Sequence, residues 1–406
     1  MSETVYDCVI VGGGLSGVSF AHYLKKKDKK VLILEKGERT GGQLQTGHLS
    51  TQPGFWYELG SHTCYNSYTS LLSIVKDLDS DDLITPLSKF SFVLYGSDKI
   101  KSIASEVSKL SCLFHFPKYF FSDKTGKTTR EYFRPIVGAS NYDRLFTNAF
   151  KAVICQPADD YPAEIFLKKR KERAKEISRR FTFKGGLSSF IDAVIKANNL
   201  EVNTLSEVVS LRKEEDVFKI ETKNGEIFQA HNIAMAANPK IASELLHKIE
   251  PELSDLLSSI PIFESESLNV TIAKDKIGLK QIAGIISLSD DFLSAVSRDL
   301  IDNDEYRSFT FHFEKERKTK SEKLELICKV LNISEQDIIE TRSIEHSLPA
   351  MRIQHLHMDE KVQAARKDKN IYLLGNYYYG LSLEDCVNRS KDEAERTSPT
   401  PPKGGA

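Results

Sequence analysis

A glycine-rich turn near the N-terminus is the feature that most constrains what this chain can fold into. Gly12-Gly13-Gly14-Leu15-Ser16-Gly17 follows the apolar run 8–11 and precedes apolar residues at helical spacing over 18–24. A second apolar run over 31–34 completes the pattern of a βαβ unit. In such a unit Gly12 permits the tight turn, Gly14 lets a pyrophosphate approach the backbone, and Gly17 lets the helix pack closely on the strand. The helix N-terminus then faces the anion.

A carboxylate at the end of the second apolar run supports a dinucleotide ligand. Glu35 stands where a carboxylate accepts hydrogen bonds from the ribose hydroxyls of an adenosine. A glycine pattern alone could be an ordinary turn, but strand, helix, second strand and terminal glutamate together indicate dinucleotide binding. An NAD enzyme would show the same unit, so the choice between nicotinamide and flavin depends on the residues that follow.

Those residues resemble the flavin amine oxidase and protoporphyrinogen oxidase superfamily. Residues 35–46 read EKGERTGGQLQT, which is similar to the superfamily pattern E-x-x-x-R-x-G-G-R-x-x-T. The resemblance implies an FAD cofactor, with a cation at Arg39 near its phosphates and backbone amides close to it at the glycine pair. Gln43 stands where the superfamily usually has arginine, which removes one charged contact. The cofactor-binding positions that the resemblance implies here are Lys36, Arg39, Gly41, Gly42 and Gln43.

Two segments in the middle of the chain resemble the same superfamily. Residues 58–63, ELGSHT, resemble a segment that passes near the flavin and the substrate mouth, which implies cofactor contacts at Gly60 and Ser61. Residues 181–190, FTFKGGLSSF, resemble a segment ahead of the return to the cofactor domain. The strand that follows implies a backbone contact between Val208 and the adenine, although Val208 taken alone could be a core valine.

The C-terminal region carries the most specific resemblance. Residues 371–387, IYLLGNYYYGLSLEDCV, resemble the closing motif L-x-G-x-x-x-x-G-V-x-x-x-D-C-I, and residues 347–356 resemble the protoporphyrinogen oxidase segment before it. Among the members of the superfamily, the chain is therefore most similar to the protoporphyrinogen oxidases. The motif binds the flavin ring and ribityl chain, and a helix N-terminus there can stabilise negative charge on the reduced flavin. The implied contacts are Gly375, Asn376, Gly380, Leu381, Ser382 and Leu383.

The resemblance implies that flavin accepts a hydride equivalent from a C–N or C–C unit of a small substrate and usually returns the electrons to dioxygen. It requires no general base, so we nominate no catalytic residue. His62, Tyr65 and Tyr378 are candidates for the pocket wall, although each tyrosine could equally be a core residue and a lone histidine is often structural. No cysteine or histidine stands in a context that demands a covalent link, so we expect noncovalent FAD.

Ser61-His62 stands where many protoporphyrinogen oxidases have Pro-Arg, an arginine suited to a propionate carboxylate. Other functions therefore stay open: an amine oxidase with a non-porphyrin substrate, a non-redox flavoenzyme of the UDP-galactopyranose mutase type, or a flavin-free binding protein like the Rab GDP-dissociation inhibitors.

The whole pattern predicts an α/β protein, α+β overall, with a Rossmann-like FAD-binding domain, a mixed-sheet substrate domain and a mostly helical insert. We place the FAD-binding domain in residues 1–66, 181–250 and 351–396, the substrate and helical insert in 67–180, and the substrate sheet in 251–350. Helices are expected over 67–78, 188–197 and 320–331, and a hairpin turn at Asn224-Gly225. Residues 397–406 are rich in Pro and Gly and predict a disordered tail.

Charge and cysteine content restrict the partners. With 56 basic and 57 acidic residues the net charge is -1, which gives no electrostatic footprint for nucleic acid. The six cysteines lie far apart and form no cluster at metal-ligand spacing, so we expect no metal site and reduced thiols in the cytoplasm. There is no signal-peptide pattern and no apolar run of 18 residues or more. The oligomeric state is open.

A basic segment allows one further partner. Residues 167–180 contain eight Lys or Arg against Glu172 and Glu176. The segment can be a solvated basic helix, or it can attract an anionic substrate or an anionic membrane surface. We therefore allow for peripheral contact with the inner face of the membrane.

Overall fold

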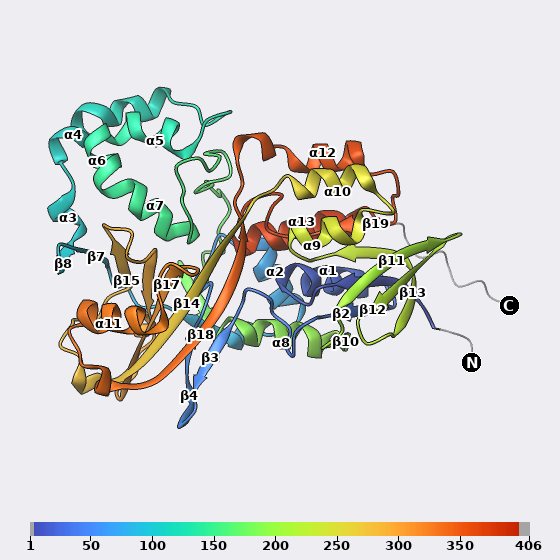
Figure 1. Cartoon of the computed structure of the whole chain (residues 1–406), viewed down its shortest axis with the longest axis horizontal. Helices are drawn as coiled ribbons and strands as arrows, with labels where there is room; N and C mark the ends of the chain where they lie inside the picture. The colour runs from blue at the N-terminus through green and yellow to red at the C-terminus, as the bar shows by residue number, and fades with distance from the viewer. Residues whose placement is uncertain (1–3, 398–406) are drawn as a thin grey trace.

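Three stretches that are far apart in sequence build one seven-stranded sheet in the computed structural model, which describes residues 4–397 (Figure 1). The strand order is β10-β2-β1-β13-β12-β11, with β19 paired to β13. The strands are β1 (Val5–Val11), β2 (Val31–Leu34), β10 (Glu201–Asn203), β11 (Val208–Glu214), β12 (Val217–Thr222), β13 (Ile227–Met235) and β19 (Ile371–Leu373). β1 runs parallel to β2 and β13, as a βαβ unit requires, and the fold class predicted from the sequence is confirmed.

Helices cover both faces of this first sheet, because alternate residues of the buried strand β1 point to opposite sides. Cys8 and Ile10 belong to the apolar core on one face of the sheet. Val9 and Val11 belong to the core on the other face. The first face carries α1 (Leu15–Lys25), α2 (Thr69–Asp77), α8 (Leu187–Ala197) and α13 (Leu383–Glu395), and the second α9 (Pro239–Leu246), α10 (Pro251–Ser258) and α12 (Met358–Ala365).

Helix α2 lies in the segment 67–180, which we predicted as the insert, but it packs in the core of the first sheet. Leu71, Ile74 and Val75 are buried there. The carboxylate of Glu384 accepts hydrogen bonds from the backbone amides of Ser70 and Leu71, which satisfies the start of the helix. The helix is thus fixed to α13 by contacts that span most of the chain.

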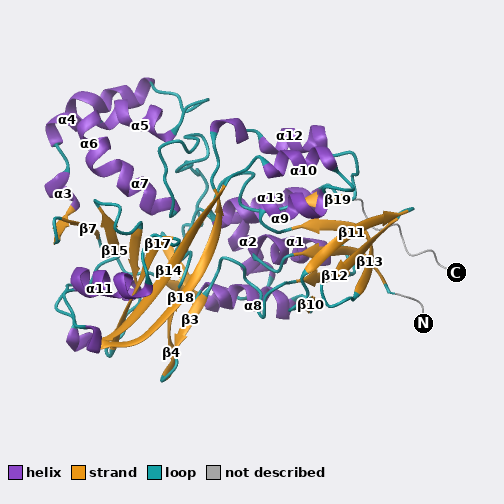
Figure 2. Cartoon of the chain, viewed as in Figure 1, coloured by secondary structure: helices purple, strands orange, loops and turns teal. Residues whose placement is uncertain are grey.

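A second seven-stranded sheet, order β18-β14-β17-β16-β15-β7-β8, is mixed, since β15 runs parallel to β7 and the other pairs are antiparallel (Figure 2). Its strands are β7 (Phe92–Gly96), β8 (Lys99–Ser102), β14 (Ile262–Ala273), β15 (Gly284–Ser287), β16 (Ser294–Ser297), β17 (Tyr306–Glu314) and β18 (Ile338–Pro349), and α11 (Lys320–Leu331) packs against it. β7 and β8 form a hairpin around Gly96, which joins this sheet rather than the helical insert because β7 pairs with β15.

Between residues 103 and 154 the insert consists mainly of helices, and these form the upper left part of the view in Figure 1. Its helices are α3 (Ile103–Glu106), α4 (Lys109–His115), α5 (Thr129–Val137), α6 (Ala139–Asn141) and α7 (Thr147–Ile154). Residues 155–179 form no helix, so the expected basic helix over 167–180 is wrong. The segment instead packs against the first sheet and its helices, which we call the first lobe. There Lys168 and Arg170 bind Asp385, and the Ala174 amide donates to the Asn66 carbonyl.

Short elements complete the chain. Two small sheets contain β3 (Thr46–Leu49) with β4 (Gln52–Glu58), and β5 (Cys64–Tyr65) with β9 (Arg180–Phe183) and β6 (Ile84–Pro86). Single helical turns are η1 (Asp81–Leu83), η2 (Phe116–Phe121), η3 (Tyr142–Phe146, a π-turn), η4 (Lys274–Lys276), η5 (Arg298–Leu300), η6 (Glu335–Asp337) and η7 (Ile353–His355). Within residues 4–397 no helix combines the length and apolar character needed to cross a membrane. All but the first residue of the predicted disordered tail, 397–406, lies outside the described residues.

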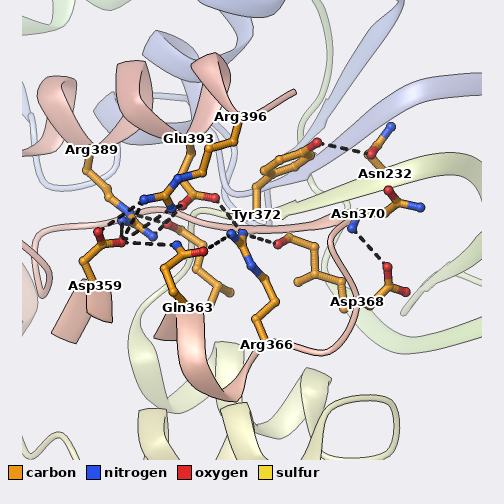
Figure 3. Close-up of polar contacts among 12 residues, drawn as sticks. Asn232, Asp359, Gln363, Arg366, Asp368, Asn370, Tyr372, Arg389, Glu393 and Arg396 are labelled. Carbon is orange, nitrogen blue, oxygen red and sulfur yellow. Dashed lines mark hydrogen bonds and ion pairs between the residues drawn. The ribbon is translucent and has the colours of Figure 1, made fainter. Parts of the chain in front are cut away.

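A buried ion-pair network joins the C-terminal elements (Figure 3). The Arg389 guanidinium is fully buried and pairs with Asp359 of α12 and with Glu393, one turn farther along α13. Glu393 also pairs with Arg366 at 3.0 Å, just beyond the end of α12. Because each buried charge has a partner, the network fixes α12 and β19 against α13.

Candidate functional site

A cavity of about 1310 Å³ lies between the first lobe and the second seven-stranded sheet with its helix, which we call the second lobe. It is lined by residues from both ends of the chain. This is larger than the roughly 300–1,000 Å³ typical of a pocket for one small ligand, so it has room for a dinucleotide and a substrate together. Most predicted site residues line it: Gly12, Gly14, Leu15, Ser16, Glu35, Lys36, Arg39, Gly41, Gly42, Gln43, Gly60, Ser61, His62, Tyr65, Val208, Gly375, Asn376, Leu381, Ser382 and Leu383. Gly13, Gly17, Gly380 and Tyr378 are not among the lining residues.

The glycine-rich turn is shaped by two different needs. Gly12 has φ +108°, and a Cβ there would lie 2.7 Å from the Ala236 carbonyl oxygen. A Cβ on Gly17 would lie 2.1 Å from the Gly12 carbonyl oxygen. A Cβ on Gly14, by contrast, would meet only Gly42 at 3.7 Å. The fold itself therefore requires Gly12 and Gly17, whereas Gly14 leaves open space at the start of α1, where free amides and the helix dipole favour an anion.

Glu35 holds its carboxylate in place with two backbone hydrogen bonds. Oε2 accepts from the Gly13 amide and Oε1 from the Gly37 amide, each at 2.8 Å. The carboxylate is thereby fixed at the cavity wall beside the glycine turn, where a ribose diol would meet it. Gly13, although outside the lining, takes part in the site as a donor to Glu35.

Arg39 holds the loop that contains Gly41 and Gly42 in place beside the glycine-rich turn. Its guanidinium donates to the carbonyls of Thr40, Leu44 and Gly42 at 2.7, 3.1 and 3.2 Å. The Gly41 amide donates to the Gly13 carbonyl at 2.8 Å, so the two turns touch. Desolvation by burial lowers the pKa of Arg39 from its ordinary value. The predicted cation is thus present at the cavity wall, and its side chain also shapes the loop around it.

The closing segment reaches the same cavity through the start of α13. The Ser382 hydroxyl caps this helix by accepting from the Asp385 amide at 3.1 Å. Asp385 in turn pairs with Lys168 at 3.2 Å and with Arg170 at 3.0 Å. A Cβ on Gly380 would lie 2.8 Å from Asp385 Oδ2, so Gly380 acts by letting that carboxylate approach.

Tyr378 does not form part of the pocket wall, contrary to the sequence-based candidate. Its ring is buried and lies 4.1 Å from the Arg389 guanidinium, in the network of the C-terminal elements. Arg389 prefers the electron-rich face of a tyrosine in a dry environment, and this draws the ring away from the cavity. Of the three predicted pocket residues, His62 and Tyr65 line the cavity.

Two further histidines, His312 and His346, line the cavity with His62. The Ser267 hydroxyl lies 2.7 Å from His312 Nδ1 and 2.9 Å from His346 Nε2, and His346 Nε2 also contacts the Leu59 carbonyl oxygen at 2.9 Å. His346 Nδ1 faces the Gln43 side-chain oxygen at 2.5 Å. The arginine usual at position 43 is thus replaced by a residue that orients an imidazole.

Burial lowers the pKa of all three imidazoles from the ordinary value of histidine. Burial lowers the pKa of His62 to about 4, with a smaller contribution from Arg180, and lowers the pKa of His312 to about 3. Burial also lowers the pKa of His346. Sequence reasoning identified His62 from its neighbours, but nothing local marked His312 or His346, because strand pairing alone brings β17 and β18 beside residue 62. Cys155 and Ser294, which also line the cavity, were missed for the same reason.

Basic side chains of the segment 167–180 line another part of the cavity. They are Lys168, Arg170, Arg173 and Arg179. Lys168 and Arg170 are paired with Asp385, whereas within residues 4–397 no ion pair involves Arg173 or Arg179. The segment therefore adds basic side chains to the cavity wall.

Comparisons with known proteins agree with this geometry. The chain is 45% identical to (S)-6-hydroxynicotine oxidase of Paenarthrobacter nicotinovorans over 56 residues, which span 14% of this chain and only 13% of that enzyme. Its fold is similar to that of a provisionally assigned protoporphyrinogen oxidase of Exiguobacterium sp. 255-15, with a TM-score of 0.76, 14% identity, and coverage of 97% of this chain and 99% of that one. Cyclohexylamine oxidase of Brevibacterium oxydans IH-35A gives a TM-score of 0.72 at 13% identity, covering 97% and 98%.

A family model described as flavin containing amine oxidoreductase matches residues 15–274, well over half of the chain. Three features of the site fit the dinucleotide part of a flavin cofactor: the glycine turn, the fixed Glu35 carboxylate and the Gly41-Gly42 loop. The chain belongs to the family of flavin containing amine oxidoreductases.

Proposed function

We propose that the protein is an FAD-dependent oxidase that dehydrogenates a C–N or C–C unit of an anionic organic substrate, as a protoporphyrinogen oxidase does. The observation that carries the proposal is a cavity that is lined both by the dinucleotide turn at Gly12 and by His62, His312 and His346. FAD would supply the hydride acceptor, and dioxygen the final electron acceptor. The chain's own residues bind and orient the cofactor, exclude water and select the substrate.

The proposal includes a noncovalent cofactor, because the cavity thiols are poor nucleophiles. Burial raises the pKa of Cys155 to about 11 and that of Cys386 to about 12. Both thiols are therefore protonated at neutral pH, and the thiolate is the reactive form. All six cysteines are free, which suits the reducing cytoplasmic compartment that we propose for the protein.

An anionic substrate is favoured over a protonated amine by the charges around the cavity. Arg173 and Arg179 add positive charge to the wall, and Arg180 lies close enough to His62 to lower its pKa. Of the five acidic lining residues, Glu35, Glu207, Glu244, Glu345 and Asp385, the last is paired with both Lys168 and Arg170. A tetrapyrrole with propionate carboxylates would find bidentate partners in these arginines, whereas an ammonium group would be repelled.

The test is an anaerobic absorbance spectrum of the FAD-loaded protein before and after addition of protoporphyrinogen, followed by air. We expect the flavin bands to bleach and to return with formation of porphyrin. An Arg173→Gln/Arg179→Gln variant should raise the substrate concentration needed for half-maximal bleaching about tenfold or more, because charge-assisted hydrogen bonds are lost. Lys329→Gln, at a surface ion pair with Asp98 away from the cavity, is the control.

If an amine such as cyclohexylamine bleached the flavin and protoporphyrinogen did not, the substrate would be an amine rather than an anion. Flavin bands that respond to neither compound would overturn the oxidase proposal and turn attention to a non-redox reaction on a sugar nucleotide.

A further inference from the structure

The insert carries an unusually apolar surface at α4 and the turn η2 that follows it. Leu110, Leu113 and Phe114 of α4 are 65, 71 and 70% exposed. Phe120 and Phe121 of η2 are 72 and 91% exposed. We call these five side chains the insert surface. Isolated exposed apolar residues are ordinary, but five large ones within twelve residues mark a contact site.

Helix α4 turns its polar side toward the protein, which is the reverse of an ordinary surface helix. The Asn141 side chain, 2% exposed, clamps its start by accepting from the Ser108 amide at 2.8 Å and donating to the Ser108 carbonyl at 3.1 Å. It also lies 3.3 Å from Cys112 Sγ. Ser111 packs so closely on Gly138 that a Cβ there would lie 2.1 Å from Ser111 Oγ.

The spacing explains the reversed orientation. Positions 111, 112 and 115 share the inward side of α4 and are Ser, Cys and His. Positions 110, 113 and 114 share the opposite side and are Leu, Leu and Phe. The polar contacts of the insert thus hold α4 in place, and the apolar stripe of the helix faces outward.

Within the stretch that carries the insert surface, the charged side chains are of one sign. Residues 107–121 contain Lys109 and Lys118 and no Asp or Glu. Both lysines are exposed. Leucine and phenylalanine on one side with lysine at the edge is the composition of a helix that lies in the headgroup region of an anionic bilayer. A partner protein would commonly require polar groups that match one another at the rim, and these fifteen residues offer few.

We infer that the insert surface seats the protein on an anionic lipid bilayer, with Phe114 and Phe121 entering the acyl boundary and Lys109 and Lys118 meeting lipid phosphates. This does not depend on the proposed oxidase function. It also moves peripheral membrane contact from the segment 167–180, where the sequence had suggested it, to residues 109–121, because Lys168 and Arg170 are bound to Asp385 inside the molecule.

The experiment is co-sedimentation of the full FAD-loaded chain with vesicles of phosphatidylcholine containing about one third phosphatidylglycerol. We expect the protein to sediment with these vesicles, and less so with pure phosphatidylcholine or at high salt, because each lysine near an anionic surface adds attraction. Phe114→Ser/Phe121→Ser should weaken the partition coefficient about tenfold or more, since two large apolar groups no longer leave water.

The matched control is Ile227→Ser/Ile339→Ser, which removes two exposed apolar side chains, 52 and 45% exposed, from β13 and β18 and should sediment like the wild type. Far-UV circular dichroism and bound flavin content establish that both variants are folded. Wild type that stays in the supernatant, or equal sedimentation of the two variants, would overturn the inference. A concentration-dependent oligomer that the Phe114→Ser/Phe121→Ser variant abolishes, without vesicle binding, would assign the surface to a second copy of the chain instead.

Discussion

Glu58 is a buried carboxyl group whose protonation should control stability. Its Oε1 accepts from the Leu187 amide at 2.7 Å and its Oε2 from the Thr46 hydroxyl at 3.0 Å, yet burial dominates and raises its pKa to about 8. Between pH 4.5 and 8 the unfolded chain ionises this group while the folded chain keeps it protonated, so stability falls as pH rises through that window. Glu58→Gln should remove the fall, which amounts to about 3 kcal/mol by pH 7.

Urea unfolding at pH 5 and at pH 8 measures this effect. We expect the Glu58→Gln variant to gain on the wild type at pH 8 and to differ little at pH 5. Glu325→Gln, at an exposed position of α11, serves as control and should leave the pH dependence unchanged. An equal slope with pH in wild type and Glu58→Gln would show that the carboxyl is already ionised in the folded protein.

At the scale of the strand-turn-helix element, two glycines of one motif should respond differently to alanine. Gly17→Ala forces a Cβ to within 2.1 Å of the Gly12 carbonyl oxygen, so it should destabilise the fold itself by several kcal/mol. Gly14→Ala meets only an ordinary contact at 3.7 Å and leaves α1 intact. Its methyl group would instead fill the space reserved for the pyrophosphate, and FAD affinity should fall about tenfold or more.

Thermal unfolding of the flavin-free proteins and titration with FAD separate the two effects. Gly14→Ala should melt like the wild type and bind FAD weakly, whereas Gly17→Ala should melt early. If Gly14→Ala bound FAD as the wild type does, the glycine turn would not be the pyrophosphate site.

At the scale of the whole molecule, the two lobes should unfold as one unit that FAD stabilises. Residues from the N-terminal, central and C-terminal thirds share the first sheet, whereas Trp56, the single tryptophan, lies in β4 outside that sheet. Arg298 of the second lobe donates to the Trp56 carbonyl at 2.8 Å. Unfolding followed by Trp56 fluorescence and by far-UV circular dichroism should therefore coincide.

FAD at 100 times its dissociation constant should raise the free energy of unfolding by about 2.7 kcal/mol by both probes. The Gly14→Ala variant should show a much smaller increase at the same FAD concentration. Two separate transitions, with FAD shifting only the circular dichroism signal, would mean that the lobes are independent.

The sequence by itself determined the local parts of this protein. The βαβ unit, the need for glycine at positions 12 and 17, the place of Glu35 and the strand-turn-helix around Gly375 depend on residues that are close together in the chain, so their pattern predicts them. The resemblance to the superfamily extended this to a flavin cofactor and to further residues of the cavity lining.

Only the tertiary structure decided which distant residues meet. The pairing of β14 with β17 and β18 brings His312 and His346 beside His62, and no local pattern encodes that pairing. Asp385 binds Lys168 and Arg170, and the segment 167–180 does not form the helix that its composition suggested. Arg389 takes Tyr378 out of the pocket. In each case a buried contact across a long stretch of chain outweighs a local preference, because burial makes an unpaired charge or polar group far more costly than a change of backbone conformation.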